Sequence, residues 1–189
     1  GMPGCGKSLT AKATAKLFGL PLLKMDIGSL MGKYVGESEG NMRRAIAVAE
    51  AVSPCVLWVD EVEKAFAGIG SGAAGSEVAT RLFGYFLTWM QEKTAQVFVV
   101  TTANDISVLP PELLRKGRFD EIFYVDFPNE ADRKAIFRVH LDKRKKMNQQ
   151  IDLHKLAKAT DKYSGADIES IVKEGIERAF LANRAELDT

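Results

Sequence analysis

The first eight residues, Gly1 to Ser8, read GMPGCGKS and combine a glycine-rich turn with a lysine and a hydroxyl group. Such a turn lets several backbone N–H groups point at one anion, and the start of a following helix adds its positive dipole end. In the spacing G-x-x-x-x-G-K-S, Lys7 can reach terminal phosphates and the Ser8 hydroxyl can ligate Mg²⁺. The pattern predicts a phosphate-binding loop, and a plain glycine turn before a helix is the weaker alternative.

Two acidic residues, Asp60 and Glu61, follow the apolar run 55–59. Such a run is typical of a strand that is buried on both faces of a parallel sheet, so the acids are expected at its carboxyl end. There Asp60 can hold Mg²⁺ through its water shell, and Glu61 can polarise a water that attacks a phosphoryl group. Two solvated acids at a strand end are the alternative, which the phosphate loop makes weaker.

Three further polar residues follow later elements. Asn104 comes after the apolar run 96–101 and can orient the attacking water, although an Asn before an Asp also forms simple turns. Arg115 and Arg118 stand three apart beside a glycine. They form either a solvated basic turn or a pair of fingers that stabilise charge on a phosphate bound by a neighbouring subunit. The second interpretation requires an oligomer with active sites at its interfaces.

The elements that must position these residues alternate between strands and helices as far as Pro128. Helices are predicted over 8–18, 38–52, 76–92 and 110–114, and strands over 20–27, 55–59, 96–101 and 121–127. Loops are predicted over 28–36 and 68–75. The alternation predicts an α/β fold with right-handed crossovers and a doubly wound parallel sheet.

After Pro128 only helices are predicted, over 130–146, 152–160 and 165–183. We therefore expect a large α/β domain of residues 1–128 and a small all-helical domain of residues 129–189. In phosphate-loop folds a strand leads into the glycine loop. Since no residue precedes Gly1, we expect the first strand to be missing and the helical domain to be truncated at its end. We also expect residues 1–189 alone to bind nucleotide weakly or not at all.

The composition argues against several classes of protein. Lys and Arg number 26 and Asp and Glu 25, which leaves a net charge of +1 and no general affinity for nucleic acid or anionic membranes. Cys5 and Cys55 form neither a disulfide framework nor a zinc spacing, which indicates a reducing compartment. No apolar run approaches the roughly 18 residues of a membrane-spanning helix. We expect a soluble cytoplasmic protein.

These motifs occur together in one known family. The phosphate loop, the hhhhDE strand end, TTAND, LLRKGRFD and, in the helical part, YSGADI follow one another in this order in the AAA ATPases, which the chain resembles over essentially its whole length. The runs GCGKSLTAKA, SPCVLWVDEVEKAF and KAIFRVHL are most similar to the poorly characterised AAA proteins of algal plastids, cyanobacteria and related bacteria. Neither His140 nor His154 lies in an H-E-x-x-H sequence, so no zinc protease site is expected.

The resemblance implies a P-loop ATPase that needs Mg²⁺ and binds ATP between its α/β domain and a helical AAA lid. It implies that Asn104 is the sensor-1 residue, and that Arg115 and Arg118 act in trans within a hexameric ring. The implied metal ligands are Ser8 and Asp60. The implied nucleotide contacts are Pro3, Gly4, Cys5, Gly6, Lys7, Ser8 and Leu9 in the loop and helix start, and His140, Gly165 and Ala166 in the lid. Without the family, His140 would be taken as a solvated helix residue.

The stretch 33–36, KYVG, lies where AAA unfoldases carry an aromatic pore loop. Tyr34 and Val35 are therefore candidates for gripping a threaded polypeptide, since an exposed aromatic offers a large apolar face. Packing of Tyr34 beneath its own loop is an equal alternative. The stretch 68–75 departs from the usual second pore loop.

We therefore expect an ATP-hydrolysing AAA module that remodels a protein substrate in a ring-shaped homo-oligomer. It would act in the cytoplasm, or in the plastid stroma if the source is an alga. The alternative is a nucleotide-dependent assembly switch or scaffold with negligible turnover, against which the presence of Glu61 and both arginines counts. A nucleic-acid motor comes third, because the basic run 143–146 is more simply a solvated helix end.

Overall fold

The computed structural model describes residues 1–30, 37–66, 69, 76–115, 117–184, 187 and 189. The chain forms two compact units. The first, the lid unit, joins Gly1–Gly6 to Tyr124–Thr189, and the second, the sheet unit, comprises Lys7–Phe123. The domain boundary expected at Pro128 stays a prediction.

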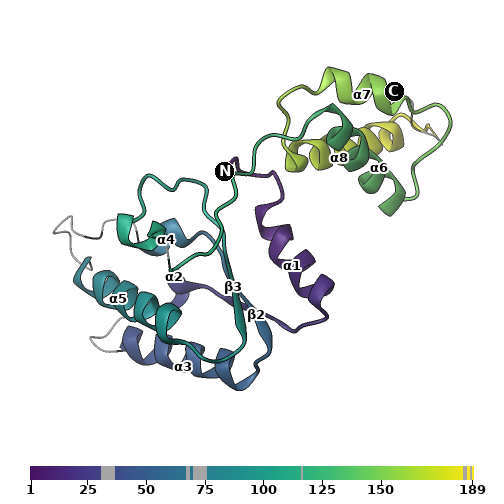
Figure 1. Ribbon diagram of the computed structural model, residues 1–189. Coiled ribbons are helices and arrows are strands. Elements are labelled where there is room, and N and C mark those ends of the chain that lie inside the picture. The colour runs from purple at the N-terminus through teal and green to yellow at the C-terminus, as the bar shows by residue number, and fades with distance from the viewer. Residues whose placement is uncertain (31–36, 67–68, 70–75, 116, 185–186, 188) are drawn as a thin grey trace. The chain divides into compact units, whose positions relative to one another are not determined.

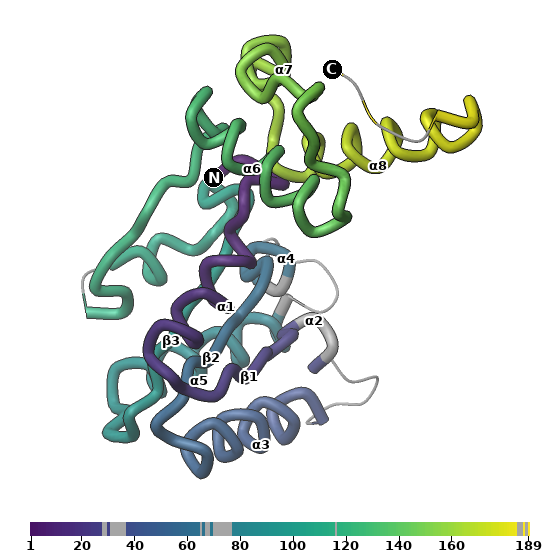
Figure 2. Tube along the Cα trace, turned by 90° about the vertical axis from the view of Figure 1, so that its right-hand side faces the viewer, coloured from purple at the N-terminus to yellow at the C-terminus, as the bar shows by residue number. Residues whose placement is uncertain are grey.

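Across its described residues, the sheet unit is built on three parallel strands, β1 (Leu22–Met25), β2 (Cys55–Val59) and β3 (Val97–Thr101), in the order β1-β2-β3. Figure 2 shows them side by side in this order. All five residues of β2 are buried, as its continuous apolar sequence predicts for a strand covered on both faces. Because the strands are parallel, their carboxyl ends lie at the same edge, where Asp60 and Thr102 follow β2 and β3.

Helices cover both faces of this sheet (Figure 1). The helix α1 (Lys7–Phe18) lies on one face, and α3 (Glu37–Ala51) and α5 (Ser76–Glu92) lie on the other. Three short elements complete the unit, α2 (Ile27–Leu30), α4 (Val62–Phe66) and the 3₁₀ helix η1 (Pro111–Leu114). The α/β fold with a parallel sheet is thus confirmed.

The core of the sheet unit lies mainly between the sheet and the helices α3, α4 and α5. Aromatic rings fill much of it, and the centroids of Phe66 and Phe83 lie 4.9 Å apart in an edge-to-face arrangement. Leu82 is fully buried among them. Packing of this density fixes the helix α4, which carries the residues directly after Asp60 and Glu61.

Three local predictions require correction. Residues 121–127 do not form a strand, because a strand needs a continuous ladder and the backbone bond from Met2 N to Val125 O (2.9 Å) is not continued as one. The expected loop 28–36 begins instead as the helical turn α2, and residues 31–36 lie outside the described residues. The helix α4 was not predicted, since five residues are too few for a periodic pattern.

In the part of the lid unit that the structure describes there are three helices, α6 (Glu130–Lys143), α7 (Leu153–Ala159) and α8 (Gly165–Leu181). Two of them begin with a capping box, in which Asn129 or Ser164 exchanges hydrogen bonds with the acid three residues later. The apolar core of the unit comprises Phe137, Leu141, Ile151, Ile168 and Val172.

One arginine is buried beside this core. Arg133 donates from Nε to Ala157 O (2.9 Å) and from Nη1 to Pro128 O (2.8 Å), so backbone carbonyls satisfy its guanidinium. These bonds tie α6 to the end of α7 and to the segment before α6. Among the described residues, no helix has both the length and the apolar character needed to cross a membrane.

The packing of Leu82 leads to a stability prediction. Leu82→Ala should lower the free energy of unfolding by about 2–5 kcal/mol, because it removes a buried side chain and leaves a cavity. The same substitution at Leu17, which is 81% exposed on α1, should change it by less than about 0.5 kcal/mol. Urea unfolding measures both values, and equal losses in the two variants would contradict this description of the core.

Candidate functional site

The glycine loop before α1 uses conformations that favour glycine. Gly4 and Gly6 have φ angles of 72° and 94°, in the left-handed region that other residues rarely adopt. Lys7 and Ser8 then begin α1, so the N–H groups of a helix N-terminus follow the turn directly. Such a turn suits an anion, and the binding role of these residues stays a prediction. Pro3 in the same loop is exposed, and the Cys5 thiol donates to Pro3 O (3.6 Å).

Within the lid unit, Gly4 packs against the start of α8. Ala166 N donates to Gly4 O (3.1 Å), and a Cβ added at Gly4 would lie 2.6 Å from Ser164 Oγ. A side chain at Gly165 would likewise crowd Gly4 O, at 3.2 Å. The structure therefore brings three candidate nucleotide contacts together, Gly4, Gly165 and Ala166.

In the sheet unit, the Ser8 hydroxyl meets the carboxylate that follows β2. Ser8 Oγ donates to Asp60 Oδ1 (3.1 Å), and Thr102 Oγ1 donates to the same oxygen (2.6 Å). Lys24 Nζ lies 3.5 Å from the other oxygen, Oδ2. Burial raises the pKa of the Asp60 carboxyl, but the bonds from Thr102 and Ser8 and the charge of Lys24 outweigh burial and hold the pKa below its ordinary value of 3.8.

The pair formed by Ser8 and Asp60 suits a hard divalent cation. A hydroxyl and a carboxylate oxygen lie side by side, and Mg²⁺ takes few protein ligands because it keeps most of its waters or binds substrate phosphates. Among the described residues there is no cluster of three or more His, Cys, Asp or Glu side chains that could hold a metal by itself. The donor set thus fits a cation that is shared with a phosphate.

Glu61 has an unusual backbone and a charged neighbour. Its φ angle is 51°, and its N–H donates to Thr102 Oγ1 (3.2 Å), which holds the turn after β2 against the end of β3. Its carboxylate oxygen Oε2 lies 2.6 Å from Lys64 Nζ, in an exposed ion pair one helical turn along. The bond to Glu61 raises the pKa of Lys64. As the structure stands, a lysine partly neutralises this carboxylate.

Asn104 follows β3 and is held by a neighbouring carboxylate. Glu63 Oε1 accepts hydrogen bonds from both the backbone N and the side-chain Nδ2 of Asn104, each at 3.0 Å. Asn104 is exposed, whereas Glu63 is buried. The structure thus places Asn104 at the same sheet edge as Asp60 and Glu61, in contact with the buried Glu63.

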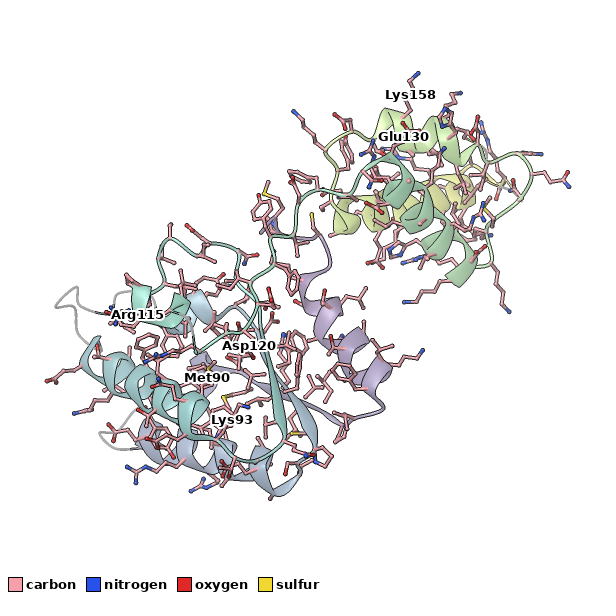
Figure 3. The ribbon with its side chains drawn as sticks, viewed as in Figure 1. Met90, Lys93, Arg115, Asp120, Glu130 and Lys158 are labelled. Atoms are coloured by element: carbon pink, nitrogen blue, oxygen red, sulfur yellow. The ribbon has the colours of Figure 1, made fainter. Side chains whose placement is uncertain are left out.

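Arg115 and Arg118 lie in the turn after η1, where Figure 3 labels Arg115. Arg118 N donates to Arg115 O (3.3 Å). The Arg115 side chain is exposed and has no hydrogen-bond or ion-pair partner in the described part of the chain. Arg118 is partly buried, and its Nε is buried without a partner there. The two arginines therefore differ in exposure, although the sequence motif predicts the same role for both.

His140 on α6 belongs to a charged cluster in the lid unit. Its Nδ1 lies 3.2 Å from Arg144 Nη1 and 3.9 Å from Glu169 Oε1. Arg144 Nη2 and Lys173 Nζ also bind Glu169, at 2.8 and 3.1 Å, and with Lys173 as the larger cause they lower the pKa of Glu169 to about 2. Because a guanidinium can only donate, His140 Nδ1 accepts, which leaves the proton of the neutral ring on Nε2.

Of the other candidates, one is exposed and two lie outside the described residues. Leu9 is 65% exposed on α1. Tyr34 and Val35 of the expected pore loop lie outside the described residues, as does nearly all of the stretch 68–75. Their proposed roles stay predictions.

Residues that the sequence analysis did not single out complete the site. Thr102, Glu63 and Lys64 contact Asp60, Asn104 and Glu61 respectively. In the sequence, Glu63 and Lys64 could have been found from their position within one helical turn of Asp60 and Glu61. Thr102 could have been found from its position in TTAND. Each of these polar residues would look like an ordinary turn or surface residue by itself.

The sheet unit and the helical lid unit agree with two families of known proteins. Residues 1–127 match the ATPase family associated with various cellular activities (AAA), and residues 150–189 match the AAA+ lid domain. The chain belongs to the AAA family, and the resemblance stated from its motifs is confirmed.

Curated relatives cover nearly the whole chain. It is 51% identical, over 97% of its length, to the uncharacterized AAA domain-containing protein ycf46 of Pyropia yezoensis, and spans 37% of that protein. Over 92% of its length it is 36% identical to the human ATPase family gene 2 protein homolog A and 35% identical to the cell division cycle protein 48 homolog of Archaeoglobus fulgidus. It spans 20% and 24% of these two, so the activity and partners of a whole protein are proposals.

The cluster around His140 leads to a titration prediction. Burial lowers the pKa of His140 below 6.5, an effect that Glu169 opposes and Arg144 reinforces. Glu169→Gln should therefore lower this pKa further, and Arg144→Gln should raise it. An unfolded chain binds the proton more readily, so the stability that neutral His140 contributes is lost as the pH falls below about 6.5.

The pH dependence of the His140 ring resonances in NMR spectra measures these shifts. Glu177→Gln, on the exposed part of α8, serves as the control and should leave the pKa unchanged. A pKa of His140 above 6.5, or a rise in Glu169→Gln, would contradict the described cluster.

Proposed function

We propose that this chain is the ATP-hydrolysing module of a protein that works as a ring-shaped homo-oligomer and remodels a protein substrate. The observation that carries the proposal is the meeting of Ser8, Asp60 and Thr102 directly beside Glu61, at the sheet edge where Asn104 also lies. This arrangement follows a glycine loop and a helix N-terminus, which together suit a triphosphate.

In this proposal each residue has one task. Lys7 binds the terminal phosphates, and Ser8 and Asp60 would hold Mg²⁺, which supplies neutralising charge for them. Glu61 accepts a proton or hydrogen bond from the attacking water, and Asn104 orients that water. For Glu61 to act, its carboxylate must exchange the bond to Lys64 for one to water, which an exposed ion pair permits at little cost.

The proposed nucleotide contacts extend to the lid. Gly165 and Ala166, which pack on Gly4, support a nucleotide that touches both the phosphate loop and the start of α8. His140 would offer its Nε2–H to the ribose or base. We also propose that the functional boundary between the α/β domain and the lid lies between residues 128 and 129.

Removal of the Glu61 carboxylate tests the chemistry. Glu61→Gln in the full-length parent protein should lower ATP turnover by about 10²-fold or more, because an amide cannot accept the proton of the water. Binding of a slowly hydrolysed ATP analogue should change little. Glu92→Gln, at the exposed end of α5, is the matched control. Equal and near-zero turnover in the parent and Glu61→Gln proteins would contradict hydrolysis and favour a nucleotide-dependent assembly switch.

The exposure of Arg115 favours a partner outside its own subunit, and mixed oligomers test this. Arg115→Ala should lower turnover by about 10³-fold if it acts as a finger. Mixing Arg115→Ala with Glu61→Gln subunits should restore part of the activity, since an interface can then combine an intact Glu61 with an intact arginine of its neighbour. Arg44→Ala, on an exposed part of α3, is the control. No recovery at any mixing ratio would contradict action in trans.

The remodelling role depends on the pore loop. Tyr34→Ala should abolish the stimulation of turnover by an unfolded protein substrate while basal turnover persists. If it changes nothing while ATP still drives assembly, the switch or scaffold is the better description.

A further inference from the structure

We propose that Glu63 is a positioning residue for ATP hydrolysis, which fixes the orientation of the Asn104 side chain through two hydrogen bonds to one carboxylate oxygen. The inference rests on the proposed hydrolysis and adds to it a residue on α4. Its basis is the contact between Glu63 and Asn104.

The geometry of this contact is that of a clamp. Glu63 Oε1 lies 3.0 Å from the backbone N and 3.0 Å from Nδ2 of Asn104. The two bonds restrain both the backbone and the side chain of one residue from the same point. The helix α4 that carries Glu63 is itself fixed, because Val62 and Phe66 on either side of Glu63 are buried in the core.

The clamp also selects one of two orientations of the amide. A carboxylate can only accept, so the NH₂ end of Asn104 must face Glu63 and Oδ1 must face the opposite way. Without Glu63, the Asn104 amide would lose the acceptor that selects this orientation, and a turn of 180° would present the wrong group to a water. Orientation of a reacting water is the task proposed for Asn104, so a fixed amide bears directly on the rate.

Stability alone does not explain a carboxylate at this position. Glu63 is 7% exposed, and its second oxygen, Oε2, is buried without a hydrogen-bond partner among the described residues. A buried charged group with an unpaired oxygen is unfavourable for folding. Asn104 is exposed, so water could satisfy its N–H groups in the absence of Glu63. Because Glu63 is unfavourable for folding at this position, we explain its presence by the orientation that it gives to the Asn104 amide.

The test compares Glu63→Leu with Glu63→Gln in the full-length protein. Leucine keeps much of the volume and removes the acceptor, so kcat for ATP should fall about ten- to hundredfold with little change in KM. Glutamine keeps a carbonyl oxygen that can accept both bonds, and should retain kcat within about threefold. The melting temperature of Glu63→Leu should not fall, which a merely structural role for Glu63 would require. Glu92→Leu is the exposed control and should leave turnover unchanged.

A double-mutant cycle asks whether Glu63 acts through Asn104. In the Asn104→Ala background, Glu63→Leu should change kcat by less than about twofold, because the side chain to be oriented is gone. A full loss of activity in that background would overturn the inference, as would unchanged kcat in Glu63→Leu or equal losses in Glu63→Leu and Glu63→Gln.

Amide hydrogen exchange provides a measurement that does not depend on turnover. The Asn104 N–H should exchange about tenfold faster in Glu63→Leu than in the parent or Glu63→Gln proteins, because its acceptor is gone. A parent protein without turnover would overturn the proposed hydrolysis. Unchanged exchange in Glu63→Leu would overturn the clamp itself, so the two failures are distinguishable.

Discussion

The carboxylate of Asp60 joins three parts of the sheet unit, and the rest of the site depends on that junction. One of its oxygens accepts hydrogen bonds from Ser8 at the start of α1 and from Thr102 after β3. Thr102 Oγ1 also accepts from Glu61 N, and Thr102 O accepts from Val62 N. The turns that follow β2 and β3 are therefore held together by a few short bonds. If these hydrogen bonds broke, Glu61 and Asn104 would no longer be held in fixed positions relative to each other.

The parts of the fold that the sequence predicted well are those whose pattern reports burial directly. The strand β2 and the helix α5 were predicted at their observed bounds, because one is a continuous apolar run and the other has a long apolar face. Residues 121–127 have a similar apolar run, yet form no strand. An apolar run indicates that a segment can be buried. A strand also needs a hydrogen-bonded partner strand, and the local sequence pattern does not show whether one is present.

The site divides in the same way. Motif spacing singled out Ser8 and Asp60, and the structure places them in contact, although their role toward a metal stays a prediction. Spacing did not single out Glu63, because its hydrogen-bond partner Asn104 is 41 positions away in the sequence. Nor did spacing reveal that Lys64 pairs with Glu61, or that Arg118 is less exposed than Arg115. A sequence motif identifies residue types and their spacing. Which side chains they contact and how deeply they are buried depend on how the chain packs.

The outer edge of β3 has a consequence for handling the protein. In the described part of the chain β3 pairs with β2 alone, and Phe98 on it is 50% exposed, with its ring 5.5 Å from that of Phe18. An open strand edge beside exposed aromatic rings is a template for pairing with other chains. At high concentration this edge favours association of one sheet unit with another. Dilute samples and added charge near the edge would counter it.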